Sequence, residues 1–211
     1  MSIGDIRRDY ARARLDEGDV AADPYTQFGR WFEDARRAEL GDANAMVLAT
    51  ATPDGTPSAR VVLLKGFDQG GFTFFTDYRS QKGRELAANP RAALVFYWRE
   101  LERQVRIAGS VGRAPAAASD AYFRSRPRAS RLSAWASHQS ECVESRAALE
   151  ARVRELDARY PGDDVPLPPY WGGFVVVPDR VEFWQGRENR LHDRINYTRT
   201  GGGWLTERLS P

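Results

Sequence analysis

Short strand-like runs follow one another along much of this chain, and most are separated by turn residues rather than by helices. Pro53-Asp54-Gly55 and residues 68–71 are typical turns, so the first three runs are predicted to form an antiparallel meander. A doubly wound parallel sheet would need a helix between successive strands. The pattern therefore disfavours that fold and predicts an antiparallel barrel, mainly β within the α+β class, with added helices. The runs lie at residues 45–51, 60–65, 72–76, 92–98 and 103–111.

Helices and further strands are predicted from the remaining sequence. Asp23 and Pro24 are typical of a helix start, and Ser80 is predicted to cap a short helix that ends near Asn89-Pro90. A helical region interrupted at Pro127 is expected over residues 115–160. Further strands are expected at residues 173–177 and 181–185, in a segment through Tyr197, and at residues 204–208. Residues 1–22 are predicted to be a mobile, charged segment, and residues 23–211 a single domain.

Composition excludes several classes of protein. With 42% hydrophobic residues in 211, the chain can bury a sizeable core, and its net charge of +2 argues against a nucleic-acid-binding protein. The single cysteine, Cys142, excludes an internal disulfide and fits a reducing cytosol. One cysteine and two histidines make no ordinary zinc site. No signal peptide or membrane-length apolar run is apparent, so we expect a cytoplasmic protein with no membrane partner.

The two lysines stand out in this chain. Of its 31 lysine and arginine residues, 29 are arginines and only Lys65 and Lys82 are lysines. Lys82 follows the predicted N-cap Ser80, where free backbone N–H groups favour a phosphate. Arg60 and Lys65 bracket an apolar strand, and their odd spacing predicts opposite faces. Solvated surface positions remain the alternative for each of these cations.

Two other segments also combine cations with groups that can bind a ligand. If residues 190–194 form a strand, Arg190, His192 and Arg194 share one face, where an anion would relieve repulsion and the histidine would stay neutral. In the second segment, Tyr122 and Arg126 lie one helical turn apart, and the break at Pro127 is expected to leave backbone N–H groups free beside Arg126 and Ser130. A phosphate suits this segment; the patch is too short to favour nucleic acid.

Together these segments resemble the pyridoxamine/pyridoxine 5′-phosphate oxidase family, over nearly the whole chain from Arg7 to Pro211. The resemblance implies a split antiparallel β-barrel of Greek-key type that binds FMN and works as a homodimer with active sites at the subunit interface. Its most specific segments are residues 60–65, 101–105, 125–128 and 171–174, together with 181–186 and 190–194.

The resemblance also implies roles for individual residues. The implied FMN contacts are Arg60, Val61, Leu63, Lys65, Phe75, Thr76, Gln81, Lys82, Gln104, Gln139, Ser140, Trp184 and Arg194. The implied contacts to the substrate phosphate are Lys65, Tyr122, Arg126 and Ser130. Arg190 and His192 would hold the pyridine ring as the catalytic pair, and Arg7 and Tyr10 would close over it as a lid. Gln81 stands where the family commonly has arginine, which implies a weaker hold on the FMN phosphate. Phe75 stands where tyrosine is common, and a backbone contact would tolerate that change.

The implied reaction is FMN-dependent oxidation of pyridoxamine or pyridoxine 5′-phosphate to pyridoxal 5′-phosphate, with O2 as acceptor and H2O2 as product. One alternative is a related FMN oxidase of phenazine precursors, which has less need of a substrate-phosphate cluster. The other is a non-catalytic flavin- or haem-binding split-barrel protein, against which the pair Arg190 and His192 argues.

Overall fold

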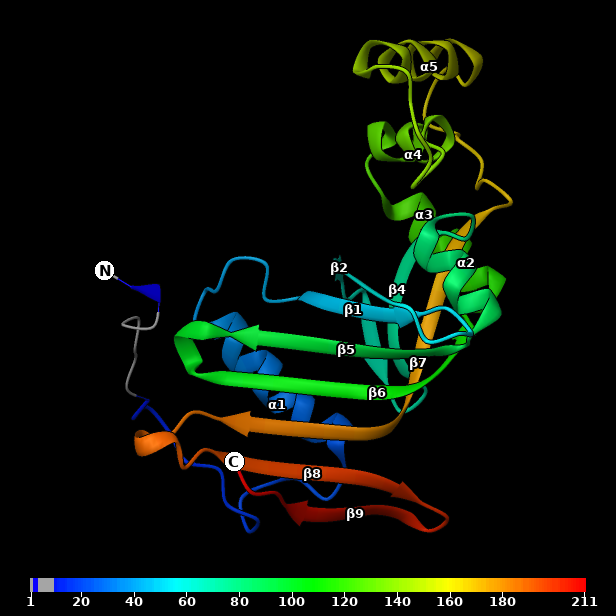
Figure 1. The fold of residues 1–211 in the computed structure, drawn as a ribbon. Helices are drawn as coiled ribbons and strands as arrows, with labels where there is room; N and C mark the ends of the chain where they lie inside the picture. The colour runs from blue at the N-terminus through cyan, green and yellow to red at the C-terminus, as the bar shows by residue number, and fades with distance from the viewer. Residues whose placement is uncertain (1, 4–9) are drawn as a thin grey trace.

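A curled antiparallel sheet of nine strands organises the protein, and its order is β2-β1-β5-β6-β7-β4-β3, with β8 and β9 following from β7 (Figure 1). The computed structural model describes residues 2–3 and 10–211. All strand pairs are antiparallel, so the predicted split barrel with surrounding helices is confirmed. The strands are β1 Ala45–Ala51, β2 Pro57–Leu63, β3 Gly66–Asp68, β4 Gly71–Asp77, β5 Arg91–Trp98, β6 Arg103–Arg113, β7 Trp171–Gln185, β8 Asp193–Thr200 and β9 Gly203–Arg208.

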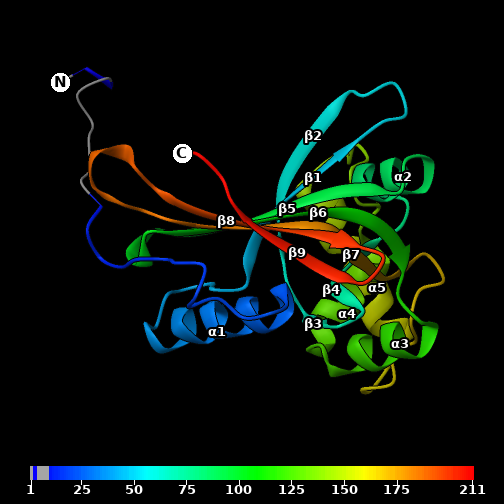
Figure 2. The same cartoon turned by 90° about the horizontal axis from the view of Figure 1, so that it is seen from below.

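Four of the α-helices gather at one end of the sheet, and α1 lies apart from them (Figures 1 and 2). The helix starts follow the predicted caps, because Asp23 accepts hydrogen bonds from the backbone N–H groups of Tyr25 and Thr26, and Ser80 accepts one from Gly83. Among the described residues no helix is both long and apolar enough to cross a bilayer. The helices are α1 Pro24–Arg37, α2 Gln81–Ala88, α3 Ala116–Ser125, α4 Arg128–Ala136 and α5 Arg146–Arg159, with the short 3₁₀ helices η2 Arg99–Leu101 and η3 Glu188–Arg190.

The predicted meander of the first three runs is wrong. β1 and β2 form a hairpin, but β2 ends at Leu63 and is not paired with β4. After β2 the chain crosses to the other edge of the sheet, where β3 pairs with β4 and β4 pairs with β7. A turn sequence fixes a local reversal of the chain, but curling of the whole sheet decides which strands become neighbours.

One long strand, β7, connects the two halves of the sheet. Its first part, Trp171–Val176, pairs with β4, and its second part, Arg180–Gln185, pairs with β8. Two separate strands were expected here, at residues 173–177 and 181–185, and the structure joins them into one. The register with β6 shifts at Ala108 and Gly109, and a Cβ on Gly109 would lie 2.0 Å from the Val177 carbonyl oxygen. Glycine therefore allows the strands to approach closely at the bend.

The core lies between α1 and the inner face of the sheet. Phe28 of α1 is fully buried and packs edge-on against Phe67, Phe72 and Phe96. A smaller apolar cluster under α3 and α4 contains Phe123, Leu132, Val165 and Trp171. The helical region is also broken at residues 137–145, in addition to the expected break at Pro127. That extra loop carries two of the predicted cofactor residues.

The described part of the N-terminal segment lies against the sheet. Leu15 and Ala21 are buried with the core, and the Tyr197 hydroxyl donates a hydrogen bond to the Ala21 carbonyl. Arg12 N–H and the Leu15 N–H donate to Glu102 and Asp193. Leu15 and Ala21 thus join the core, while most of residues 10–22 lie exposed on the surface of the domain. The closing movement predicted for this segment stays a prediction.

Candidate functional site

Lys82 is a buried cation whose close polar partners are neutral. Its side chain is 8% exposed, and Nζ donates hydrogen bonds to Gln139 Oε1 at 2.8 Å, Thr76 Oγ1 at 3.3 Å and Ser80 Oγ at 3.4 Å. Burial lowers the Lys82 pKa most, the Arg60 charge lowers it further, and the more distant carboxylates of Asp77 and Glu85 act in the opposite direction. Within the described chain no carboxylate forms an ion pair with Nζ. A buried ammonium without a counter-ion is costly, so this pocket suits an anion.

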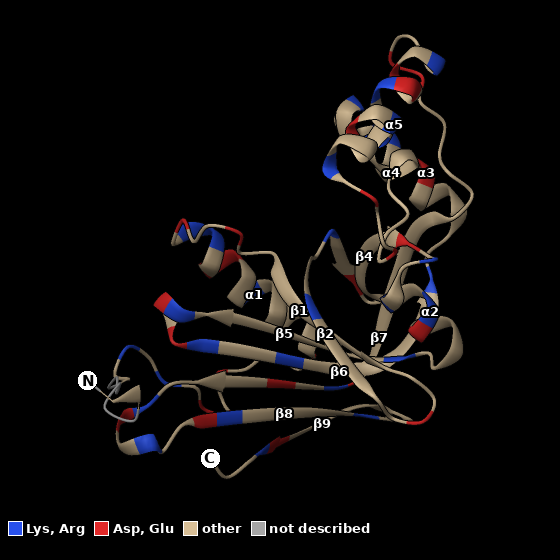
Figure 3. Cartoon of the chain, turned by 45° about the horizontal axis from the view of Figure 1, so that its top comes forward, with Lys and Arg blue, Asp and Glu red and all other residues tan. Residues whose placement is uncertain are grey.

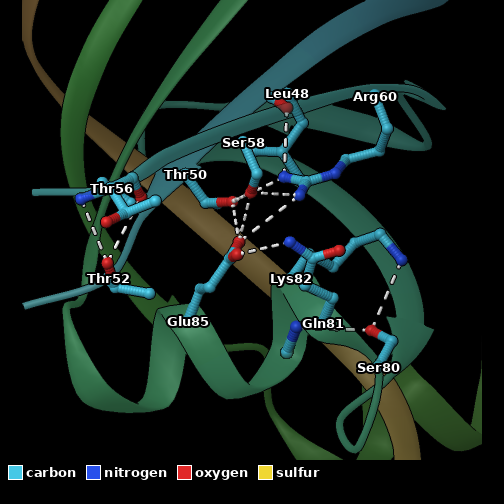
Figure 4. A network of polar contacts seen from close by, with 12 residues as sticks. Leu48, Thr50, Thr52, Thr56, Ser58, Arg60, Ser80, Gln81, Lys82 and Glu85 are labelled. Atoms are coloured by element: carbon cyan, nitrogen blue, oxygen red, sulfur yellow. Dashed lines mark hydrogen bonds and ion pairs between the residues drawn. The ribbon is translucent and has the colours of Figure 1, made fainter. Parts of the chain in front are cut away.

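Arg60 enters the same region from β2, on the side of the strand opposite to Val61 (Figure 4). Its guanidinium donates to the Leu48 carbonyl, to Thr50 and Ser58, and to Glu85, with Nη2 3.3 Å from Glu85 Oε2. Burial opposes ionisation of Glu85. Hydrogen bonds from Ser58, Thr50 and Gln81, together with the Arg60 charge, outweigh burial and lower the Glu85 pKa to about 2. Glu85 is therefore ionised at neutral pH.

Gln81, a predicted cofactor residue, is engaged within α2. Its Nε2 donates to Glu85 Oε1 at 2.9 Å, one helical turn away (Figure 4). Thr76 and Gln139 belong to the Lys82 pocket, and the hydroxyl of Thr76 donates to Gln139 Oε1 at 2.8 Å. Ser140, next to Gln139, has a left-handed backbone with φ 72°. Thus four predicted FMN contacts, Arg60, Thr76, Lys82 and Gln139, come together from separate parts of the chain.

A stack of aromatic rings with two cations forms the second cationic region. Phe75 and Tyr122 stack with ring centroids 4.1 Å apart, and Trp171 lies nearly parallel to Tyr122 at 6.1 Å. The Arg126 guanidinium is 4.8 Å from the centroid of the Trp171 ring, and Lys65 Nζ is 5.9 Å from that of Tyr122. Such contacts hold cations against apolar walls.

Arg126 has a buried group without a partner. Its Nη1 is inaccessible and forms no hydrogen bond with any described residue, and burial lowers its pKa. The expected break at Pro127 is confirmed, because α3 ends at Ser125 and α4 begins at Arg128. Arg126 N–H donates to the Phe123 carbonyl and Ser130 N–H to that of Pro127, whereas no described side chain caps the start of α4. The expectation of free backbone N–H groups beside Arg126 and Ser130, at the first residues of α4, stays a prediction.

Arg190 and His192 lie in an irregular loop, not on a strand as expected. Asn189 and Arg190 have φ angles of 54° and 62°, and β8 begins only at Asp193. Left-handed backbone at a residue such as arginine stores strain, which often marks functional loops. Arg190, His192 and Arg194 therefore do not share a strand face. Arg194 instead forms an ion pair with buried Glu182, with Nε 2.9 Å from Oε1.

His192 is packed between aromatic rings. Its ring centroid is 4.7 Å from Trp184 and 5.6 Å from Tyr10, and Nδ1 accepts a hydrogen bond from the Arg187 N–H at 3.1 Å. Burial lowers the His192 pKa most, the Arg190 charge lowers it further, and Asp193 acts in the opposite direction. The lowered pKa agrees with the neutral histidine that was expected from the sequence. Arg7, the other predicted lid residue, lies outside the described residues.

The remaining predicted residues lie on the sheet. Val61 and Leu63 point outward from edge strand β2 and are 66% and 38% exposed, and Gln104 is paired across β6 and β7 with Trp184. In Figures 1 and 2 the loop after β7, which carries Arg190, lies at the far end of the molecule from α3 and α4. One chain therefore does not bring Arg190 and His192 to the Arg126 region.

An apolar patch covers the outward face of β1, β2 and β5. Val61 pairs with Val47, and Val47 pairs with Val95, so one row of valines crosses three strands. Figure 3 shows β1 and β2 largely free of charged residues. We call this surface the valine face; its outward residues are Ala45, Val47, Ala49, Ala59, Val61, Leu63, Ala93, Val95 and Tyr97. Exposed apolar area of this kind commonly marks a protein interface.

Sequence reasoning missed two of the buried glutamates, Glu85 and Glu182. Glu85 and Glu182 each pair with an arginine predicted to contact the cofactor, Arg60 and Arg194 respectively. A signal for Glu85 existed, because it lies three residues after Lys82 on a short helix and so shares its buried side. Glu182 offered no comparable signal, because its partner is on a neighbouring strand.

Comparison with known proteins covers the whole chain. Residues 32–160 match the family model described as pyridoxamine 5′-phosphate oxidase, and residues 171–211 match the pyridoxine 5′-phosphate oxidase C-terminal dimerisation region. A pyridoxine/pyridoxamine 5′-phosphate oxidase of Rubrobacter xylanophilus is 61% identical over 99% of this chain and 96% of its own. One of Burkholderia multivorans is 58% identical over 100% of this chain and 99% of its own.

Solved structures show the same fold. PhzG from Burkholderia lata, in complex with tetrahydrophenazine-1-carboxylic acid, is 35% identical and has a TM-score of 0.89, covering 95% of this chain and 99% of its own. A pyridoxamine 5′-phosphate oxidase-related, FMN binding protein of Nostoc punctiforme is 22% identical with a TM-score of 0.72, covering 91% of this chain and 100% of its own. From the family models and the curated relatives, the chain belongs to the pyridoxine/pyridoxamine 5′-phosphate oxidase family.

Proposed function

We propose that this protein uses FMN to oxidise pyridoxamine 5′-phosphate or pyridoxine 5′-phosphate to pyridoxal 5′-phosphate, with O2 as acceptor and H2O2 as product. The observation that carries this proposal is the buried, unpartnered Nη1 of Arg126. Lys65 and Tyr122 lie beside it, and the pocket of Lys82 is a second, separate cationic region. An enzyme that binds both a phosphorylated cofactor and a phosphorylated substrate needs two such regions.

The Lys82 pocket fits the FMN phosphate. A phosphate would supply the counter-ion that buried Lys82 lacks, and it would accept hydrogen bonds that now go to neutral Thr76 and Gln139. Arg60 adds positive charge at the same pocket. FMN, when bound, supplies the redox chemistry by accepting two electrons from the substrate and passing them to O2. The protein supplies binding, orientation and proton positions.

The substrate phosphate would bind Arg126, Lys65, Tyr122 and Ser130. The Arg126 Nη1–H would then gain an acceptor, which removes the cost of a buried, unsatisfied donor. The stacked rings of Phe75, Tyr122 and Trp171 hold the guanidinium in place. A phosphate fixed in this way anchors one end of a small substrate and limits how its ring can lie.

Arg190 and His192 would hold the pyridine ring. Because His192 Nδ1 accepts from the Arg187 N–H and the imidazole is neutral, the ring proton is on Nε2. That Nε2–H can donate to an oxygen or nitrogen of the substrate. Arg190 supplies a positive charge that opposes protonation of the histidine. The pair can therefore orient a polar ring substituent without adding a second charge at the imidazole.

We also propose that the complete site forms only in a homodimer. Arg190 and His192 lie far from the Arg126 region in one chain, so residues from two chains would have to meet (Figures 1 and 2). The valine face offers an apolar surface for such contact, and the match to a dimerisation region over residues 171–211 supports it. Tyr10 and Arg7 would close over the assembled site.

A phenazine-precursor oxidase is the second candidate, because PhzG shares 35% identity and a TM-score of 0.89 with this chain. The relatives named for vitamin B6 oxidation are 56–61% identical, which favours the first reading. The predicted substrate-phosphate residues favour it as well. A non-catalytic flavin or haem carrier would have no need of Arg190 and His192.

The test is a spectrum and an assay of the purified protein. We expect the visible spectrum of bound flavin, and formation of pyridoxal 5′-phosphate and H2O2 from pyridoxine 5′-phosphate or pyridoxamine 5′-phosphate. Unphosphorylated pyridoxine is the matched control and should react poorly, because it lacks the group that Arg126 would bind. Flavin-loaded protein that turns over neither phosphorylated substrate would overturn the proposal, and turnover of tetrahydrophenazine-1-carboxylic acid instead would establish the second candidate.

A further inference from the structure

Glu85 accepts hydrogen bonds from residues of three different elements. Thr50 of β1 and Ser58 of β2 donate their hydroxyls to Oε2 at 2.5 and 2.6 Å, and Arg60 Nη2 is 3.3 Å from the same oxygen. Gln81 of α2 donates to Oε1. The carboxylate is buried, with a side chain 7% exposed. Glu85 therefore ties α2, which carries Lys82, to the strand that carries Arg60 (Figure 4).

Arg60 is held by the same set of groups. Both Nη1 and Nη2 are used for Leu48, Thr50, Ser58 and Glu85, whereas Nε–H forms no hydrogen bond with any described residue. Thr50 and Ser58 each contact both the guanidinium and the carboxylate. A side chain bound at four points has little rotamer freedom, so its charge and its free N–H keep a fixed position.

The charges in this region do not cancel. Glu85 pairs with Arg60, while Lys82 has neutral partners. Without Glu85, two cations would face each other across the pocket, and the Arg60 side chain would be free to turn away from Lys82 toward solvent. With Glu85 present, Arg60 stays beside Lys82, and the region keeps one excess positive charge for an anion.

We propose that Glu85 is a positioning residue for phosphate binding, acting through Arg60 and Gln81 rather than by touching the ligand. This inference rests on the proposed function of the Lys82 pocket as the FMN phosphate site. It also gives Gln81 a role that differs from direct contact: the amide completes the hydrogen bonds of Glu85. Gln81 is shorter than the arginine common in the family, and it is neutral. It would then contribute to the pocket through the Glu85 carboxylate.

The experiment compares FMN with riboflavin, which lacks the phosphate, by titrating flavin-free protein and following quenching of flavin fluorescence. For Glu85→Gln we expect FMN to bind about 10-fold more weakly, because loss of a hydrogen bond to a charged group costs that order of affinity. Riboflavin affinity should change little. The melting temperature of the flavin-free protein should fall, because the Glu85 carboxylate also stabilises the fold at neutral pH. Glu155→Gln on the exposed face of α5 makes the same charge change and is the matched control.

Two further variants separate positioning from charge and cover the case in which Glu85→Gln does not fold. Glu85→Asp keeps the charge but withdraws the carboxylate, so it should weaken FMN binding as well. In the Arg60→Ala background, Glu85→Gln should have little additional effect, because the residue through which it acts is gone.

The outcomes are distinct. Unchanged or tighter FMN binding by Glu85→Gln would mean that the carboxylate only repels the phosphate, and equal losses for FMN and riboflavin would mean a general structural role; either overturns the inference. Full additivity of Glu85→Gln and Arg60→Ala overturns it too. If the unaltered protein binds riboflavin as well as FMN, the phosphate assignment of the pocket fails first, and this inference fails with it.

Discussion

The pocket around Lys82 and the loop that carries Arg190 and His192 are built in opposite ways. The pocket is buried, and its side chains are bound to one another from β2, β4, α2 and the loop after α4. The loop is more open, Arg190 is exposed, and two consecutive residues have left-handed backbone. One region is fixed by hydrogen bonds within the chain, and the other is held chiefly by aromatic contacts.

The contrast indicates where each region finds its missing partner. Lys82 lacks only a counter-ion, which a small phosphate can supply. The loop lacks the residues that would bind the other end of the substrate. The Arg126 region, which would supply them, lies at the opposite end of the same chain (Figure 1). In our proposal, the first region binds its phosphate with residues of a single chain. The second, in our proposal, becomes a site only when a second copy is present.

The sharpest way to break this comparison is to prevent dimerisation. Val47 lies at the centre of the valine face, between Val61 and Val95. Val47→Asp would bury an unpaired charge in the proposed interface, which costs several kcal/mol, roughly 100-fold or more in affinity. We expect a monomer by analytical ultracentrifugation, with turnover lost. Val47→Thr, of similar size, should remain dimeric. A fully active monomer would show that one chain contains the whole site.

Substitution in the loop should abolish turnover and spare the cofactor. For Arg190→Ala we expect turnover to fall about 100-fold, because a misplaced substrate reacts poorly. The FMN content after purification should stay near that of the unaltered protein. Arg187→Ala, which removes a neighbouring cation of the same loop, is the control. Loss of flavin from Arg190→Ala would place this arginine with the cofactor and would contradict the division of roles.

Substitution in the buried pocket should have the opposite pattern. Lys82→Met keeps the length of the side chain and removes its charge, so FMN should bind about 10- to 100-fold more weakly. With saturating FMN the turnover number should recover most of its value. We would measure FMN dissociation constants beside turnover at high FMN. Unchanged FMN affinity would refute the phosphate role of Lys82.

The smallest expected effect concerns acid. The Glu85 pKa is lowered from 4.5 to about 2, so its charge contributes stability above pH 4.5, and this contribution is lost as the pH falls through 2. Urea unfolding of Glu85→Gln and of the unaltered protein should therefore differ most above pH 5 and converge toward pH 2. His192, whose pKa is lowered from 6.5, favours the folded state above that pH and loses this contribution first on acidification. If the unfolding free energies of Glu85→Gln and the unaltered protein differed by a constant amount from pH 6 to pH 2.5, the prediction for Glu85 would be contradicted.

The local features were predictable because their causes lie within a few residues. Asp23 and Ser80 cap the helices that they were expected to cap, and β1 has the predicted bounds Ala45–Ala51. The family resemblance assigned Lys82, Gln139 and Thr76 to one cofactor site, and in the fold these residues lie within hydrogen-bond distance. Strand pairing was harder: nothing in residues 57–77 says that β4 will pair with β7 instead of β2.

By itself, the sequence determined the kinds of elements, the positions of most helix starts and the cationic residues available to bind phosphates. Caps, turns and alternating burial are short-range properties of the chain. Only the tertiary structure decided that Glu85 would pair with Arg60, that Arg194 would pair with Glu182, and that Arg190 and His192 would lie far from Arg126. These relations depend on how the sheet curls and which strands meet across it, and those contacts join residues that are distant along the chain.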